Sequence, residues 1–356
     1  FPYTTLFRST NNHVVEDADE LKVSLSDERE FIAKVIGADP KTDIAVIKIE
    51  GEHLPVVTLA DSDNIRVGDV VFAVGNPLAV GQTVTMGIVS AKGRSVGILD
   101  EVAGYESFIQ TDAAINMGNS GGALVDAKGR LIGINSAILS PSRGNIGIGF
   151  AVPINLASTV MHSLIETGSV SRGYLGVQSQ TLTADDAEAL GLPRDTKGVT
   201  ITDVTPGSAA EKGGLERGDV ILSVNGKSVA ALRDLRIYIA QTPPGSKVKL
   251  TISRDGKEKQ MDVTLGKLDE NPNEILPGVD VVSLTPEARR RLGIPTRLNG
   301  LLVTTVDEDS PYAERLVTDL LILQIDRADV ADLESARKAL TPGRHMLFVY
   351  YRGALR

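Results

Sequence analysis

The chain has 356 residues, of which 42% are hydrophobic and 23% charged, as is typical of globular proteins with two or three domains. Its formal net charge of −9 argues against a nucleic-acid partner, because phosphate binding requires a basic surface. The absence of cysteine excludes disulfides and cysteine nucleophiles, and the four separated histidines form no metal-ligand pattern, so we expect neither metal nor cofactor. No apolar run reaches the ~18 residues of a transmembrane helix.

Up to about residue 153, the chain alternates short β-branched runs with Gly, Asn and Asp, which predicts an all-β barrel or sandwich. The runs are FIAKVIGAD, DIAVIKI, DVVFAVG, QTVTMGIVSAKG, RLIGINSAI and IGIGFAV. The next segment, PINLASTVMHSLIETG, has apolar residues at helical spacing and ends at Gly168, a residue type that commonly ends helices. We expect this helix to close the first domain.

An internal repeat follows this helix. The segment that starts at Gly198 corresponds to the segment that starts at Gly300, and each copy predicts a strand, a short turn, a second strand and an amphipathic helix. Two copies of this size favour tandem globular domains over a solenoid. The polar segment KLDENPNEILPG is typical of a linker between them.

The segment with the clearest chemical signature is TDAAINMGNSGGALV, in which glycines flank Ser120 on both sides. Such glycines permit a tight turn that exposes a hydroxyl and leaves backbone N–H groups free to meet an oxyanion. A surface turn is the alternative for this motif alone. However, His13 and Asp43 precede it in a chain order known for serine-hydrolase triads. Asp43 also opens the apolar run DIAVIKI, where a buried carboxylate needs a partner.

The segments TNNHVV, DPKTDIAVIKI and DAAINMGNSGGALV together resemble the catalytic segments of the HtrA (Deg) family of serine proteases. The YLGV motif and the two repeats resemble the tandem PDZ domains of its two-PDZ bacterial members, so the resemblance covers residues 10–356. It implies a mainly β fold. The implied parts are an N-terminally truncated chymotrypsin-like double β-barrel over residues 10–168, a first PDZ domain over 173–267 and a second over 275–356.

The resemblance also implies roles for individual residues. His13 is expected to be the general base, Asp43 to orient it, and Ser120 to be the nucleophile. The backbone amides of Gly118, Asn119 and Ser120 are expected to form the oxyanion hole.

The segments INSAIL and GNIGIGFAVP resemble the strand and loop that pair with the substrate and form its primary pocket. The pocket candidates Ile138, Ile146 and Ile148 are apolar and no acidic residue accompanies them, so we expect a small aliphatic residue before the scissile bond. Packing in the core is the alternative for each isoleucine.

In the first repeat, Leu175, Gly176 and Val177 match the PDZ loop whose amides capture the C-terminal carboxylate of a peptide. Leu235 and Ile239, four residues apart on the predicted helix, are expected to line the peptide pocket or to face the core. The second repeat has Pro277 in its corresponding loop, which lacks an N–H donor. A role in assembly is therefore at least as well supported there as peptide capture.

The first nine residues, FPYTTLFRS, resemble nothing in the family and read as the in-frame translation of a sequencing-library adapter. We interpret residues 1–9 as non-native, with native sequence starting at Thr10; a genuine but unusual N-terminus is the alternative. This interpretation accounts for the missing signal peptide. It also predicts an incomplete barrel with unpaired sheet edges and an unsupported His13.

The leading functional hypothesis is an ATP-independent serine endopeptidase of the bacterial periplasm, acting in protein quality control and the stress response. Its expected partners are unfolded polypeptides, exposed C-terminal peptides bound by the PDZ domains, and further copies of itself in a homotrimer or an oligomer of trimers. The absence of a nucleotide-binding loop agrees with ATP independence. The rival is a holdase chaperone or scaffold with an idle triad, although an intact His, Asp and Ser favours the enzyme.

Overall fold

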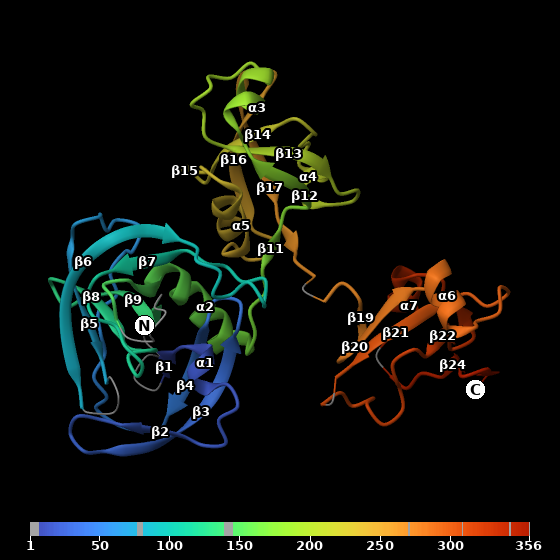
Figure 1. The fold of residues 1–356 in the computed structure, drawn as a ribbon, viewed down its shortest axis with the longest axis horizontal. Helices are drawn as coiled ribbons and strands as arrows, with labels where there is room; N and C mark the ends of the chain where they lie inside the picture. The colour runs from blue at the N-terminus through green and yellow to red at the C-terminus, as the bar shows by residue number, and fades with distance from the viewer. Residues whose placement is uncertain are drawn as a thin grey trace. The chain divides into compact units, whose positions relative to one another are not determined.

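The computed structural model describes residues 7–76, 81–138, 145–269, 271–307, 309–341 and 343–355, apart from the side chain of Ile138. It is mainly β and divides into two compact units, Phe1–Leu268 and Asp269–Arg356 (Figure 1). The predicted fold class is confirmed. Within the described ranges, no helix combines the length and the apolar character that crossing a bilayer requires.

The chain begins with an open antiparallel sheet in the strand order β1-β4-β3-β2. Its apolar side chains, among them Ala45, Ile47 and Ile49, pack with Val15 of the short helix α1. The elements are β1 (Phe7–Thr10), α1 (Asn12–Val15), β2 (Leu21–Ser24), β3 (Glu30–Asp39) and β4 (Ile44–Ile49).

Residues 7–9, predicted to be non-native, belong to β1, and β1 pairs with β4 over its whole length. The first sheet is open, so it does not close into a barrel within the described residues. The expectation that His13 lacks support is wrong, because the segment that carries it is anchored to Asp43, as described below.

Six strands form a closed barrel in the order β10-β7-β6-β5-β8-β9 (Figure 1). Alternating side chains fill its interior, and the rings of Phe108 and Phe150 lie 5.8 Å apart within the core that joins the barrel to α2. The strands are β5 (Val70–Gly75), β6 (Thr83–Arg94), β7 (Phe108–Thr111), β8 (Ala123–Asp126), β9 (Leu131–Ile138) and β10 (Gly149–Pro153).

The predicted closing helix is confirmed as α2 (Ile154–Thr167). Its apolar face packs on β4 of the open sheet and on β9 of the barrel, so one helix joins the two sheets. The helix ends where Gly168 adopts a left-handed conformation with φ +75° and donates its N–H to Leu164.

The first repeat is a small sheet in the order β12-β13-β14-β16-β17, with α5 packed beside β12. The strand β12 ends the order, so one of its edges is unpaired. The elements are β11 (Gly173–Tyr174), β12 (Val177–Thr181), α3 (Ala184–Ala189), β13 (Val199–Val204), α4 (Ala209–Lys212), β14 (Val220–Val224), β15 (Lys227–Ser228), α5 (Leu232–Ala240), β16 (Lys247–Arg254), β17 (Lys257–Thr264) and β18 (Gly266–Lys267).

The second repeat forms its own unit around a separate apolar core, with the sheet order β19-β20-β21-β22-β24-β25. Its strand order from β20 to β24 follows that of the first copy from β12 to β16, but within the described residues it has no counterpart of the short helix α4. The elements are β19 (Glu274–Leu276), β20 (Val279–Ser283), α6 (Pro286–Leu292), β21 (Leu301–Val306), β22 (Leu321–Ile325), β23 (Ala328–Asp329), α7 (Leu333–Ala339), β24 (Leu347–Tyr351) and β25 (Ala354–Leu355).

Candidate active site

His13 lies in α1, directly after β1, and faces Asp43. Its ring Nδ1 is 2.9 and 3.0 Å from the two carboxylate oxygens of Asp43, and its backbone N–H donates to Oδ1 at 3.2 Å. The hydrogen bond to Asp43 raises the pKa of His13 above 6.5; partial burial opposes this rise, and the charges of Asp43 and Glu16 add to it. Because Nδ1 is engaged, Nε2 is the ring nitrogen that remains to exchange a proton.

Asp43 is almost fully buried, with 5% of its surface exposed, at the end of a turn that leads into β4. Its φ of +56° is left-handed, a conformation that Asp tolerates better than most residues, and it turns the carboxylate toward His13. Besides His13, the hydroxyl of Ser136 donates to Oδ2 at 2.6 Å. Buried carboxylates need such donors. Ser136 is a site residue that the sequence did not reveal, although it lies within the quoted segment INSAIL.

Ser120 lies in a tight loop between β7 and β8. The N–H of Asn119 donates to Asn116 and the N–H of Gly122 donates to Asn119, while Gly118 and Gly121 have φ of +95° and +79°. The hydroxyl of Ser120 donates to the carbonyl of Ser136 at 3.1 Å. Ser136 thus contacts both Asp43 and Ser120, and Asp43 in turn contacts His13.

The three backbone amides expected to form the oxyanion hole differ in whether they are already hydrogen-bonded within this loop. The Asn119 amide is already used within the turn, at 3.0 Å from the carbonyl of Asn116. Among the described residues, no acceptor is hydrogen-bonded to the amides of Gly118 or Ser120. The geometry therefore leaves two of the three predicted amides available to a substrate oxygen.

Comparisons with known proteins all identify relatives among serine proteases and PDZ domains. A family model described as a trypsin-like peptidase domain matches residues 9–134, and a PDZ domain model matches residues 173–265. The chain is 44% identical over 351 residues to a probable periplasmic serine endoprotease, DegP-like, of Chlamydia trachomatis, covering 97% of this chain and 70% of that protein. It is 43% identical to the periplasmic pH-dependent serine endoprotease DegQ of Escherichia coli, covering 93% and 72%. This chain belongs to the HtrA (Deg) family of periplasmic serine endoproteases.

Solved structures agree with this membership. The HtrA-type protease AlgW with a tripeptide is 50% identical to this chain, with a TM-score of 0.62, over 74% of this chain and 86% of that one. The same protease with a decapeptide is also 50% identical, with a TM-score of 0.58, over 74% and 80%.

The predicted specificity pocket of this HtrA chain is only partly described. Ile148 is half-buried and packs against the core that contains Phe150, whereas Ile146 is 55% exposed just before it. The side chain of Ile138 lies outside the described residues.

In the first PDZ repeat, Gly176 has a φ of +83°, and a Cβ at this position would lie 2.2 Å from the Cβ of Ser208. Only glycine fits this turn. Leu175 is buried, and Val177 begins the edge strand β12. Leu235 and Ile239 are 3% and 6% exposed and belong to the domain core, which favours the core-facing alternative.

The corresponding loop of the second repeat already holds a carboxylate of its own chain. The N–H of Gly278 donates to Glu274 Oε1 at 2.8 Å, and the preceding Pro277 has no N–H. In this loop, the Gly278 amide is therefore already hydrogen-bonded, and Pro277 has no amide N–H to offer a peptide carboxylate.

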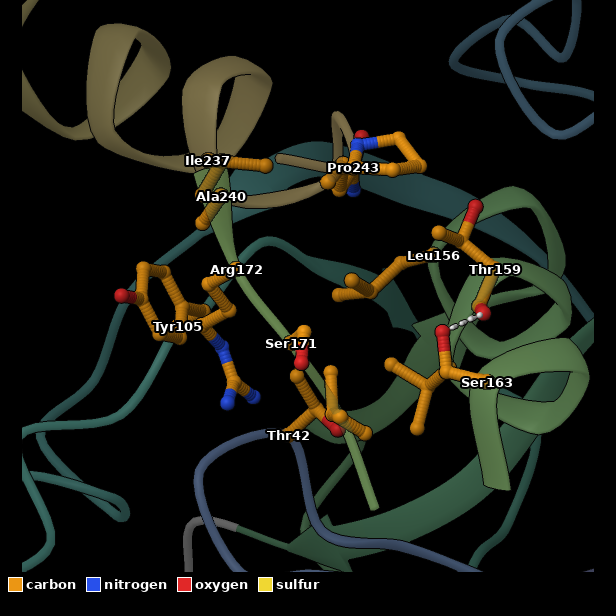
Figure 2. Close-up of a pocket in the computed structure, with 13 residues that line it drawn as sticks. Thr42, Tyr105, Leu156, Thr159, Ser163, Ser171, Arg172, Ile237, Ala240 and Pro243 are labelled. Carbon is orange, nitrogen blue, oxygen red and sulfur yellow. Dashed lines mark hydrogen bonds between the residues drawn. The ribbon is translucent and has the colours of Figure 1, made fainter. Parts of the chain in front are cut away.

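The protease and the first PDZ repeat also contact each other near Asp43. Arg172, immediately before β11, donates to both carboxylate oxygens of Asp39 at 2.8 and 2.6 Å, and both side chains are buried. Its guanidinium lies over the ring of Tyr105, 4.8 Å from the centroid. Figure 2 shows Arg172 and Tyr105 lining a pocket between α2 and α5. Asp39 begins the turn that ends at Asp43, so the PDZ linker is tied to this turn.

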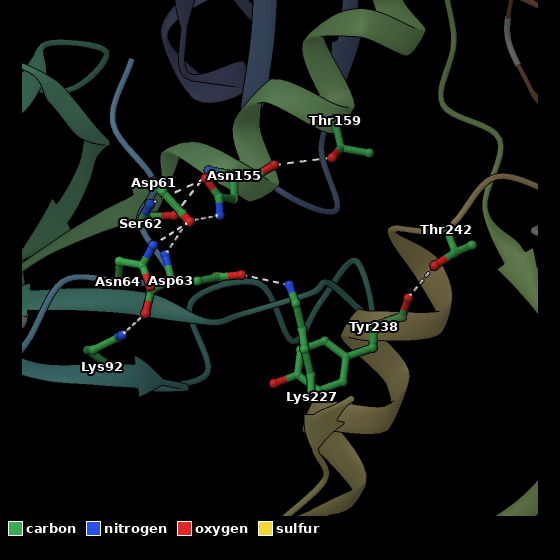
Figure 3. Close-up of polar contacts among 10 residues, drawn as sticks. All are labelled: Asp61, Ser62, Asp63, Asn64, Lys92, Asn155, Thr159, Lys227, Tyr238 and Thr242. Atoms are coloured by element: carbon green, nitrogen blue, oxygen red, sulfur yellow. Dashed lines mark hydrogen bonds and ion pairs between the residues drawn. The ribbon is translucent and has the colours of Figure 1, made fainter. Parts of the chain in front are cut away.

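A second contact is exposed. Lys227 of β15 forms a 2.6 Å ion pair with Asp63, which follows β4 in the chain (Figure 3). Lys92 donates to the carbonyl of Asp63, and Asn155 donates to Asp61 at 2.7 Å, so the protease side of this contact is held by several hydrogen bonds. The pKa of Lys227 is raised mainly by its hydrogen bond to Asp63.

Proposed function

We propose that His13, Asp43 and Ser120 form the catalytic triad of an ATP-independent endopeptidase that cuts unfolded or misfolded proteins. The observation that carries this proposal is the contact of His13 Nδ1 with the buried carboxylate of Asp43, with the Ser120 hydroxyl joined to the same cluster through Ser136. A scaffold would need no such pairing of a buried acid with a histidine.

The chemistry follows from these positions. Catalysis requires the Ser120 side chain to rotate away from the Ser136 carbonyl so that its hydroxyl reaches His13 Nε2. His13 then takes the hydroxyl proton as Oγ attacks the scissile carbonyl carbon, and returns that proton to the leaving amine. Asp43 keeps the proton of neutral His13 on Nδ1 and stabilises the imidazolium. A water activated by the same histidine hydrolyses the acyl-enzyme.

The amides of Gly118 and Ser120 are the donors that we propose for the oxyanion, because the Asn119 amide is engaged within its turn. Loss of one such donor typically costs about 3 kcal/mol of transition-state stabilisation. The half-buried Ile148 and the exposed Ile146 support, in part, a preference for a small aliphatic residue before the scissile bond.

Peptide ligands are supported by the related HtrA-type protease AlgW, whose structures contain a tripeptide or a decapeptide. We infer that the first PDZ domain, over residues 173–267, binds exposed C-termini through the loop at Leu175 to Val177 and the free edge of β12. The second, over residues 275–356, is proposed to serve assembly, because its loop holds Glu274.

An apolar surface on the barrel supports the proposed homotrimer or oligomer of trimers. Three cross-strand pairs of β5 and β6 lie side by side, and Val84 and Met86 are 62% and 69% exposed. Such surfaces commonly mark interfaces. The pairs are Val70 with Ile88, Phe72 with Met86, and Val74 with Val84. Light scattering of Met86→Lys against the native chain tests this, with a smaller assembly expected for the variant.

The experiment that tests catalysis is casein degradation by the full chain and by Ser120→Ala, with and without an activating C-terminal peptide. Ser120→Ala should lose roughly 10⁶-fold in turnover, as is typical for a nucleophile. His53→Ala is the matched control for His13→Ala, because His53 is exposed in a bend after β4.

The rival function, a holdase chaperone or scaffold, makes the opposite prediction. If the native chain and Ser120→Ala degrade casein equally, or neither does so with any activating peptide, the triad is idle. Suppression of aggregation that is equal in both chains would then support the rival. A fluorophosphonate that labels the native chain but not Ser120→Ala supports the enzyme.

A further inference from the structure

The side chain of Asn11 links two of the segments that carry the proposed triad. Its Nδ2 donates to the carbonyl oxygen of Asp43 at 2.9 Å, and its Oδ1 accepts the N–H of Gly121 at 2.6 Å. Asn11 itself is two residues before His13 and is the N-cap residue of α1. The side chain of Asn11, in the segment of His13, therefore contacts the backbone of Asp43 and the backbone of Gly121, the residue after Ser120.

Both hydrogen bonds are closed to water, because Asn11 has 0% of its surface exposed. The orientation of its amide is defined by its neighbours, since the reverse orientation would oppose the N–H of Gly121 with an NH2 group. Removal of the side chain would leave the Asp43 carbonyl without this donor and the Gly121 N–H with only its second acceptor, the carbonyl of Asn135 at 2.9 Å.

We propose that Asn11 is a positioning residue that sets the distance between the turn of Asp43 and the loop of Ser120. This inference rests on the proposed triad. Asn11 follows β1 and Asp43 precedes β4 of the open sheet, whereas Gly121 precedes β8 of the closed barrel, so the two halves of the site adjoin different sheets. A displacement of about 1 Å between reacting groups costs roughly 10²-fold in rate, and the amide of Asn11 opposes such a displacement.

The neighbouring Asn12 provides a matched control. It has the same side chain and is also buried, but among the described residues its Nδ2 donates to the carboxylate of Glu16, the C-cap residue of α1, at 3.4 Å. Asn12→Ala removes the same atoms beside His13 without touching Asp43 or Gly121.

The test compares kcat and KM of the full chain for a quenched fluorescent casein. We expect Asn11→Ala to lower kcat per folded molecule by about 10- to 100-fold, with KM within about threefold of native. Asn12→Ala should stay within about threefold in both constants. The folded fraction comes from circular dichroism and the melting temperature under the assay conditions.

Asn11→Asp adds a second measurement, the pH dependence of kcat, which should not change if Asn11 only stabilises the fold. A neutral carboxyl group has one donor and one acceptor, as the amide does, but an ionised one has only acceptors and would repel the carbonyl of Asp43. Because position 11 is fully buried, the pKa of this carboxyl group should be raised into the neutral range. The ratio of the variant's kcat to the native kcat, per folded molecule, should therefore fall by at least about fivefold between about pH 5.5 and about pH 8.5.

The outcomes separate this inference from the proposed function. Native activity in Ser120→Ala would overturn the triad itself. An inactive Ser120→Ala, together with an Asn11→Ala whose kcat per folded molecule equals that of Asn12→Ala, would overturn only the role of Asn11. If neither Asn11 variant yields folded protein, Asn11 serves folding and the positioning role is overturned. A flat kcat ratio for Asn11→Asp would do the same.

Discussion

The hydroxyl of Ser136 donates a 2.6 Å hydrogen bond to the carboxylate of Asp43. Asp43 is almost fully buried and its carboxylate is largely shielded from water. The Ser136 hydroxyl therefore supplies a hydrogen bond that water would otherwise make. The same residue accepts the hydroxyl of Ser120 through its carbonyl. The strand β9 therefore organises both the acid and the nucleophile of the proposed triad.

Ser136→Ala should lower kcat and stability together. Loss of a hydrogen bond to a charged, buried group costs about 1.5–3 kcal/mol, which urea unfolding would measure. With one donor fewer, the carboxylate attracts the proton of His13 more strongly, so the alkaline shift of the pH–rate profile should increase. Ser253→Ala, at a buried serine of the first PDZ domain, is the control. An unchanged profile in Ser136→Ala would contradict the prediction.

The pH dependence of activity should reflect His13. Its pKa lies above 6.5 because of the hydrogen bond to Asp43, and catalysis requires the neutral ring, so kcat/KM should rise with pH through a midpoint above 6.5. The contribution of this pair to the free energy of unfolding decreases as pH rises. It is fully present below about pH 6.5 and is lost as pH rises through the raised pKa of the folded state.

Asp43→Asn tests this assignment directly. Asn adopts a positive φ as readily as Asp, so the backbone at +56° should be retained. By analogy with the trypsin triad, kcat should fall about 10⁴-fold, and the pKa of His13 should decrease toward 6.5. Proton NMR of the histidine rings at varied pH measures the pKa. A native midpoint at or below 6.5 would argue against the pairing.

Gly121→Ala should impair both folding and activity. Gly121 has a φ of +79°, and a Cβ would lie 2.3 Å from Oγ1 of Thr10, next to Asn11. The matched control is Gly129→Ala, with a φ of +73° and nothing within 4 Å of the added Cβ. Both variants carry the strain of a positive φ, about 1 kcal/mol, and only Gly121→Ala adds the clash. Equal melting temperatures for the two variants would contradict this account.

The ion pair of Lys227 with Asp63 should couple the first PDZ domain weakly to the protease. Both side chains are 51% exposed, so a double-mutant cycle with Lys227→Met and Asp63→Asn should give a coupling of about 0.2–1 kcal/mol. High salt should reduce it. The exposed pair of Lys247 with Asp262, within the PDZ domain, is the reference. A coupling that is zero at low salt would show that the contact does not join the domains.

Much of this protein could be predicted from short segments. Periodicity of apolar residues was enough for α2, because the buried face of a helix recurs along the chain at a fixed spacing. The mainly β fold followed from alternating runs in the same way. The pairing of His13 with Asp43 was predicted because a resemblance in three segments names the residues, and the structure brings these two within 3 Å.

The remaining features required the tertiary structure. Ser136 and Asp43 are 93 residues apart, Asn11 and Gly121 are 110 apart, and Arg172 and Asp39 are 133 apart. The helical spacing of Leu235 and Ile239 left open whether they face the peptide pocket or the core, and only the packed domain places them in the core.

The sequence by itself determined which residues can do chemistry and which local conformations they adopt, because glycine, proline and apolar spacing act over a few residues. Only the tertiary structure decided which donor meets which acceptor. Hydrogen bonds form within about 3 Å, and such distances between remote strands depend on how the two sheets and α2 pack together.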